Sequence, residues 1–265
     1  MSRQFPALRG LAILVVVLYH SIEWTTLGGQ DLGYPPAEGL ERWVLLVLLQ
    51  LGVFAVPTFL FISGSFVAYA ARGDPPTLTW KTMWAGLARI VWPYLIWSVL
   101  FYVMIYLRRD ETYSLFGYLK NLVVGYPFHF VPLLLLFYVL SPVFLRLAQR
   151  WGWLMLAIIA LYQAVLMNVR FAGIFGFRFP DWMQYITPPV VGYALAEWAI
   201  YFPLGLVYGL DTKRLLPWLK KLKWVSLVAT CVFFALSVLD AVSVIWFPLS
   251  GYICRLTFVL WLPVI

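Results

Sequence analysis

Apolar segments long enough to cross a membrane recur along almost the whole chain. A helix needs about 20 predominantly apolar residues to span the hydrocarbon core of a bilayer. The segments of this kind, the fifth of which is short, are Phe5–Trp24, Trp43–Tyr69, Ile90–Leu107, Phe128–Leu147, Trp153–Met167, Val190–Leu210, Trp224–Phe247 and Leu249–Ile265. They predict an all-α fold, a polytopic transmembrane helical bundle with about eight spans.

The scarcity of charge excludes several classes of protein. Of the 265 residues, 63% are hydrophobic and only 11% are charged, whereas soluble domains carry about 25% charged residues. Too few charged side chains remain to cover a water-facing surface, which excludes a soluble enzyme, a nucleic-acid-binding domain and a disulfide-rich secreted module. The formal net charge of +8 is therefore interpreted as topological information, and no nucleic-acid partner is expected.

The distribution of Lys and Arg predicts the orientation in the membrane. Cytoplasmic loops carry an excess of these two residues, and here they are more numerous on the side of the N-terminus. The residues on that side are Arg3, Arg72, Lys81, Arg89, Arg146, Arg150, Lys213, Arg214, Lys220, Lys221 and Lys223. We therefore expect a cytoplasmic N-terminus, with the basic stretch Lys213–Lys223 attracted to anionic membrane lipid.

The chain has neither an internal repeat nor a Gly/Ser-rich linker, so residues 1–265 are interpreted as a single membrane domain. Its longest outer connection, Val169–Pro189, is rich in aromatic residues. Two interpretations stay open for it: an aromatic loop at the membrane interface, or a lid over a bound acceptor.

Arg9 and His20 are ionisable side chains within the first apolar segment, where such groups are costly and usually functional. Arg9 and His20 are 11 positions apart, which on a helix is three turns plus about 20° and about 16 Å along the axis. Both therefore project from nearly the same face. Histidine suits general acid–base chemistry near neutral pH, and arginine suits binding of phosphate or carboxylate. The alternatives are a snorkelling anchor for Arg9 and an interhelical hydrogen bond for His20.

Three further residues are predicted to lie at the depth of Arg9. Ser63 and Gly64 fall in the second segment, and Arg89 opens the third, with Pro93 expected in the first turn of that helix. Together with Arg9 they would form a mouth for an anionic ligand. For Ser63 and Gly64 the alternative is close helix packing, which small residues permit.

The outer side holds other polar residues at membrane depth. His129 begins the fourth segment at a depth similar to that of His20, and Glu197 lies near the outer end of the sixth. A lone His at this interface is commonly a structural residue. Arg255 lies inside the last segment, and the residues alone give no basis for pairing it with Glu197.

An ordered set of motifs resembles the acyltransferase 3 family, the multi-spanning membrane O-acyltransferases of bacterial cell envelopes. The matches are Arg9–His20 with the R-x10-H signature, Val56–Phe66 with F-F-x-x-S-G-F, Leu87–Trp97 with R-[ILV]-x-P-[YL], Phe128–Pro142 with H-L-W-F-L…P, and Tyr201–Gly209 with F-x-x-G. Leu60, Ser65 and Val131-Pro132 depart from the family pattern.

The resemblance implies a reaction and its participants. The donor would be cytoplasmic acyl-CoA, most simply acetyl-CoA, and the acceptor a hydroxyl of a cell-envelope glycan or lipid-linked sugar at the inner membrane. No bound cofactor or metal is expected. The implied catalytic residues are His20, as the base, and Arg9, which would bind or orient the CoA moiety. Arg89, Ser63 and Gly64 would also bind the donor, and His129 and Glu197 would lie on the acceptor side.

Two other functions compete with this one. A transporter or flippase would use Arg9 and His20 to line a polar path, although the sequence lacks the symmetry of two matching halves. An inactive membrane scaffold is favoured by the absence of a late S-Y-x-x-Y-L-x-H segment, since the histidines are His20 and His129 alone. On this comparison we expect residues 1–265 to lack C-terminal helices of the full family fold.

Overall fold

The computed structural model describes residues 4–31, 33–71, 73, 75–109, 112–126 and 128–264, so Arg3 and Arg72 of the predicted basic side lie outside the described residues. The described part is all-helical, as predicted, with 81% of its residues in helices. The helices are α1 (Gln4–Asp31), α2 (Gly39–Gly52), α3 (Ala55–Ala70), α4 (Trp80–Arg109), α5 (Leu115–Val124), α6 (Phe130–Arg170), α7 (Gly192–Trp198), α8 (Tyr201–Leu210), α9 (Thr212–Ala241), α10 (Ser250–Trp261) and the 3-10 helices η1 (Asp181–Ile186) and η2 (Leu262–Val264).

Five helical segments in the described part are long and apolar enough to cross a membrane. They are Gln4–Thr26, Gly39–Ala70, Trp80–Arg108, Phe130–Arg170 and Thr212–Ala241. The membrane-helix class is thus confirmed, but the predicted number of about eight spans is not.

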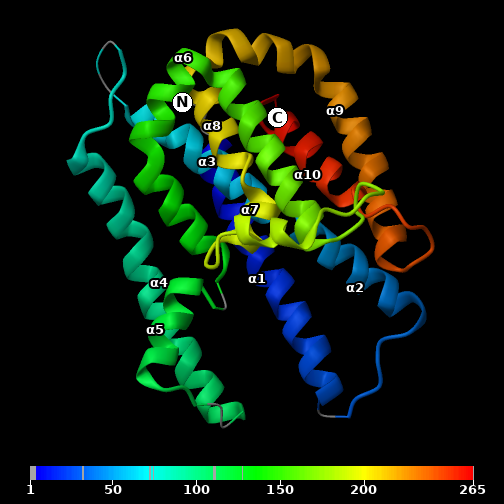
Figure 1. The fold of residues 1–265 in the computed structure, drawn as a ribbon. Coiled ribbons are helices and arrows are strands. Elements are labelled where there is room, and N and C mark those ends of the chain that lie inside the picture. Colours follow the sequence, from blue (N-terminus) through cyan, green and yellow to red (C-terminus); the bar gives the residue numbers. More distant parts are fainter. Residues whose placement is uncertain are drawn as a thin grey trace.

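One reason is that two predicted spans lie within the 41 residues of α6. The backbone of Trp151 is not helical there (φ −138°, ψ 43°), and it separates two limbs. Figure 1 shows the chain rising through the first limb and descending through the second. Phe144 of the first limb and Met155 of the second pack with Val207 of α8, so the limbs enclose part of the core.

The predicted span Val190–Leu210 is also different, because it forms the two short helices α7 and α8. They meet at Ala199 and Ile200. The side-chain oxygen of Gln163 accepts a hydrogen bond of 2.9 Å from the backbone N–H of Ile200. A buried amide on another helix thus provides a partner for a backbone donor at the break.

The second predicted span is divided in the same way. The segment Trp43–Tyr69 forms α2 and α3, with Val53 and Phe54 between them. Pro57 is the third residue of α3, where its missing N–H has no partner within the helix to lose. The helix therefore begins shortly before the proline.

The prediction that Pro93 lies in a first helical turn is wrong, because α4 already begins at Trp80. The Thr79 hydroxyl accepts a 3.3 Å hydrogen bond from the Thr82 N–H at the start of this helix, as capping residues do. Pro93 is therefore internal, and since it has no N–H, the carbonyl of Arg89 lacks its usual helical partner.

The centre of the bundle is the contact between α3 and α8, where small residues bring the two backbones together. A β-carbon at Gly64 would overlap the carbonyl oxygen of Phe202, and one at Gly205 would overlap that of Phe61. The Ser65 hydroxyl lies 3.0 Å from the carbonyl oxygens of both Phe61 and Gly205. For Gly64 the structure thus agrees with the alternative of close helix packing.

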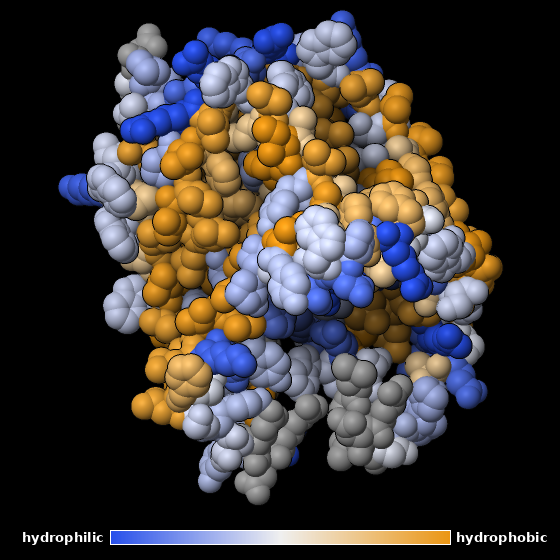
Figure 2. Space-filling view, viewed as in Figure 1, coloured by the Kyte–Doolittle hydropathy of each residue, from blue (hydrophilic) through white to orange (hydrophobic). Residues whose placement is uncertain are grey.

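The basic stretch Lys213–Lys223, expected in a loop, instead forms the first turns of α9. Figure 1 shows this part of α9 lying across the end of the molecule where α1 begins, before the helix turns down beside α10. Lys221 lies over the ring of Trp218, and Lys223 over that of Trp224. The surface at this end is hydrophilic (Figure 2).

Candidate functional site

Helix α1 carries the two polar residues of the first apolar segment on one unbroken helix. Arg9 lies near its start, and His20 lies in its second half, about 16 Å further along the axis at 1.5 Å per residue. Figure 1 shows α1 running from the interior of the bundle to the opposite end of the molecule. Arg9 and His20 therefore belong to two separate sites on the same helix.

The first site brings together cationic side chains from α1 and α4. The guanidinium of Arg9 lies 4.9 Å from the ring centroid of Phe59 on α3. Arg9 and Arg89 both interact electrostatically with the hydroxyl of Tyr138 on α6. Neither arginine forms an ion pair with a residue that the structure describes. Two cations that both act on one tyrosine hydroxyl, and that pair with no described carboxylate, are suited to binding an anion.

Ser63 and Gly64, expected beside this site, are both buried in α3. Gly64 faces the backbone of α8, and the carbonyl of Phe202 occupies the space that a ligand would need there. The structure therefore places Arg9 and Arg89 within electrostatic range of the same tyrosine, but it gives Gly64 a contact with α8 instead of an open approach.

The second site contains His20 and an acidic partner. The Nδ1 atom of His20 lies 3.0 Å from Oε2 of Glu23, and the two side chains are 46% and 37% exposed. In the tautomer that donates from Nδ1, the Nε2 atom is free to accept a proton. Glu23 was not predicted as part of a site, although its spacing of three residues from His20 on a helix is a signal for such a pair.

A cavity of about 770 Å³ lies near this second site. The Arg170 guanidinium is 4.0 Å from the ring centroid of Tyr193, and the His129 ring is 6.1 Å from the same ring. The residues that line the cavity are Val124, His129, Leu166, Val169, Arg170, Gln184, Thr187, Pro188, Pro189, Val190, Gly192, Tyr193 and Ala194. We call it the outer cavity. Figure 2 shows hydrophilic surface in the hollow below α7.

The connection Val169–Pro189 contributes directly to this cavity. Gln184 of η1 and Thr187 lie in its wall, whereas Phe177, Trp182 and Tyr185 of the same connection are exposed. The connection thus combines features of both interpretations left open by the sequence: exposed aromatic residues and a wall over a cavity.

Tyr193 joins the outer cavity to the histidine on α1. Its hydroxyl interacts electrostatically with Glu23, the partner of His20, and also with Arg170 and Glu197. This long-range interaction relates the cavity wall to the His20–Glu23 pair, and His129, whose ring is near Tyr193, lies in the same wall.

Glu197, expected on the acceptor side, lies behind the wall of the outer cavity and is paired with α10. Its Oε2 atom lies 2.7 Å from Nη1 of Arg255, and its Oε1 atom accepts a 2.6 Å hydrogen bond from Tyr252. Glu197 is 6% exposed. Both carboxylate oxygens are thus engaged by α10, so this residue fixes the position of α7 behind the outer cavity. Within the described residues, no cluster of His, Cys, Asp and Glu could hold a metal ion.

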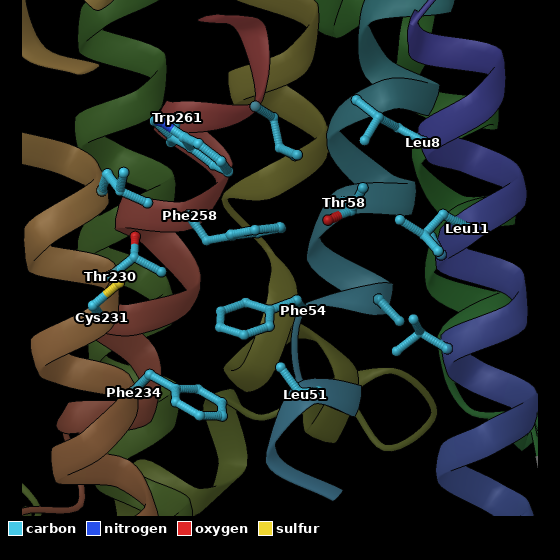
Figure 3. A pocket seen from close by; sticks show the side chains of 15 residues that line it. Leu8, Leu11, Leu51, Phe54, Thr58, Thr230, Cys231, Phe234, Phe258 and Trp261 are labelled. Atoms are coloured by element: carbon cyan, nitrogen blue, oxygen red, sulfur yellow. The ribbon is translucent and has the colours of Figure 1, made fainter. Parts of the chain in front are cut away.

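A second cavity, of about 430 Å³, is apolar (Figure 3). Leu8 and Leu11 of α1 face it from one side, and Phe258 and Trp261 of α10 from the other. Among the described residues that line it, none carries a charge.

The protein, with its apolar helices long enough to cross a membrane, is of the membrane acyltransferase class. The chain is a member of the acyltransferase 3 family, because the family model described as an acyltransferase domain matches residues 4–265. A comparison with curated proteins found no match, and neither did a comparison with solved structures.

Proposed function

We propose that this acyltransferase moves an acyl group, most simply acetyl, from cytoplasmic acyl-CoA to a hydroxyl of a cell-envelope glycan or lipid-linked sugar at the inner membrane. The observation that carries the proposal is that α1 holds near one end a cation without an ion-pair partner among the described residues, and toward the other end a carboxylate-paired imidazole. Anion binding and proton transfer, the two tasks of such a transferase, thus have separate places on one helix.

The donor end would be the site of Arg9 and Arg89. The phosphates of acyl-CoA are anionic, and two guanidinium groups near Tyr138 offer several hydrogen-bond donors to them. The basic first turns of α9 lie at the end of the molecule where α1 begins (Figure 1). A basic end of this kind supports a cytoplasmic N-terminus.

The acceptor would bind in the outer cavity and present a hydroxyl to His20. Nε2 of His20 removes the hydroxyl proton as the acceptor oxygen attacks the thioester carbonyl carbon. When the tetrahedral intermediate collapses, the C–S bond breaks, and the protonated imidazole returns the proton to the leaving thiolate. The carboxylate of Glu23 stabilises the imidazolium while it carries that proton.

The test is acyl transfer from acetyl-CoA by the purified full chain in detergent or nanodiscs. His20→Gln is expected to lower kcat by about 10²–10⁴-fold, since this is the range for a general base. Tyr19→Phe is the matched control on the neighbouring residue and should keep most of the activity. Full activity of a folded His20→Gln variant would overturn the proposal.

Acetyl-CoA binding separates the two competing functions in the same experiment. Binding without transfer by the unaltered chain is the result expected of an inactive scaffold. The absence of both binding and transfer is the result expected of a transporter or flippase. Either outcome contradicts the proposed reaction.

A further inference from the structure

We propose that the outer cavity recognises a saccharide that carries an oxyanion, either a phosphate or a carboxylate, and that Arg170 binds this group. The inference rests on the proposed function, because it names the chemical class of the acceptor. It is carried by the charge of the cavity and by the way in which Arg170 is held.

In the described wall of the outer cavity the charged side chain is Arg170, and the carboxylates of Glu197 and Glu23 interact electrostatically with Tyr193 of the same wall. Among the residues that line the cavity there is one arginine, and there is neither Asp nor Glu. Arg170 also forms no ion pair with any residue in the described part of the chain. A cation that lines a cavity without a carboxylate partner attracts an anionic ligand.

Among the described residues, the guanidinium of Arg170 contacts ring faces and donates no hydrogen bond. It lies over the ring of Tyr193 at 4.0 Å from the centroid, and a contact with a ring face leaves the five N–H groups of arginine available. Tyr193 belongs to α7, which the ion pair of Glu197 with Arg255 ties to α10. The ring of Tyr193 that contacts Arg170 therefore lies on a helix whose position is fixed by the ion pair of Glu197 with Arg255.

Other groups in the wall suit a sugar. The Thr187 hydroxyl is buried and makes no hydrogen bond with the described residues, although Thr187 lines the cavity. Gln184 adds an amide, and His129 adds a ring near Tyr193. A volume of about 770 Å³ lies within the range of about 300–1,000 Å³ for small-molecule sites.

The same oxyanion chemistry could come from a lipid headgroup, because the connection around η1 exposes Trp182 and Tyr185 and aromatic residues favour the membrane interface. The experiment therefore includes both sources. The full chain is placed in nanodiscs of phosphatidylcholine, and the binding of glucose 1-phosphate, glucuronic acid and glucose is measured by thermophoresis. A parallel series uses nanodiscs that contain phosphatidylglycerol.

In phosphatidylcholine, the two charged sugars are expected to bind about tenfold more tightly than glucose, since each gains a charge-assisted hydrogen bond that glucose does not make. Arg170→Gln should abolish this preference, and Arg170→Lys, which keeps the charge but loses the planar fork, should retain part of it. Arg178→Gln is the matched control in the same connection and should leave the preference unchanged.

Equal binding of the three sugars, or an unchanged preference in Arg170→Gln, would overturn the proposal. So would Arg170-dependent retention of phosphatidylglycerol without any binding of the charged sugars, because the site would then serve a lipid. Since no acyl donor is present, this result is separate from the test of the proposed reaction. Loss of the sugar preference with normal acyl transfer contradicts the inference alone.

Discussion

Arg255 of α10 and Glu197 of α7 form a buried ion pair across 58 positions of sequence, with 2.7 Å between Nη1 and Oε2. The Tyr252 hydroxyl donates a hydrogen bond to the other carboxylate oxygen of Glu197. Tyr193, which lines the outer cavity, lies one helical turn before Glu197 on α7. The pair thus links the packing of α10 to the geometry of the outer cavity.

Breaking this pair should destabilise the protein strongly. Arg255→Met leaves the carboxylate of Glu197 buried without its cation, which costs about 3–5 kcal/mol. The measurement is the free energy of unfolding in detergent by chemical denaturation. Arg214→Gln, which removes an exposed pair with Asp211 at 4.0 Å, is the control and should change stability by about 0–1 kcal/mol.

The double variant Glu197→Gln/Arg255→Met provides a second check on the same pair. With both charges removed, no buried ion is left unpaired, so the double variant should be more stable than Arg255→Met alone. Equal stability of Arg255→Met and the unaltered chain would contradict the assignment of a buried pair.

Adding a methyl group at the α3–α8 contact should also destabilise the fold. A β-carbon at Gly205 meets the backbone carbonyl of Phe61, and backbone atoms on two packed helices move apart only at a cost of about 1–3 kcal/mol or more. Thermal unfolding of Gly205→Ala checks this. Gly10→Ala in α1, where nothing lies within 4 Å, is the matched control, and an equal melting temperature for both variants would contradict the prediction.

Replacing Gln163 should weaken the junction of α7 and α8. Gln163→Leu leaves the N–H of Ile200 without its side-chain acceptor, and an unsatisfied buried donor costs about 1–3 kcal/mol. The free energy of unfolding is the readout. Gln149→Leu is the control, because Gln149 is exposed and its bond to the Pro76 carbonyl lies at the surface; a loss as large there would argue against the role of the buried junction.

Under the proposed function, the arginines of the donor end should control donor affinity. Arg9→Gln and Arg89→Gln should each raise the KM for acetyl-CoA by about tenfold, because a charge-assisted hydrogen bond to phosphate is lost. Steady-state kinetics at saturating acceptor measure this. Lys81→Gln, at the start of the same α4, should leave KM nearly unchanged, whereas a rise as large as that of Arg89→Gln would point to a general charge effect.

Glu23 is expected to act through His20 as a positioning residue. Glu23→Gln should lower kcat by about tenfold to hundredfold with little change in KM, since the carboxylate that stabilises the imidazolium is removed. Glu23→Asp should restore part of the rate. Glu41→Gln, which removes an acid from the first turn of α2, is the control, and a parallel rise in KM for Glu23→Gln would show that the residue acts on binding instead.

The sequence was informative where the chemistry is local. Apolar runs predicted the helical membrane class, and helical spacing placed Arg9 and His20 on one helix. The breaks in these helices could not be predicted, because they depend on partners from elsewhere in the chain. Gln163 supplies an acceptor at the α7–α8 junction, and no pattern near Ile200 reveals it.

The same distinction holds for the candidate sites. The pairing of Glu197 with Arg255 requires α7 and α10 to be neighbours, which is a property of the fold and not of spacing. Arg170 and Tyr193 likewise meet only because α6 descends beside α7. Glu23 was within reach of sequence reasoning, since it follows His20 by three residues.

The continuity of α1 has a consequence for the choice of donor. Because an unbroken helix has a fixed rise per residue, it keeps Arg9 and His20 about 16 Å apart along its axis. A small anionic acyl donor held at Arg9 would leave its reactive carbon out of reach of a hydroxyl beside His20. Under the proposed function, this distance therefore requires a donor in which a long arm separates the charged part from the acyl group.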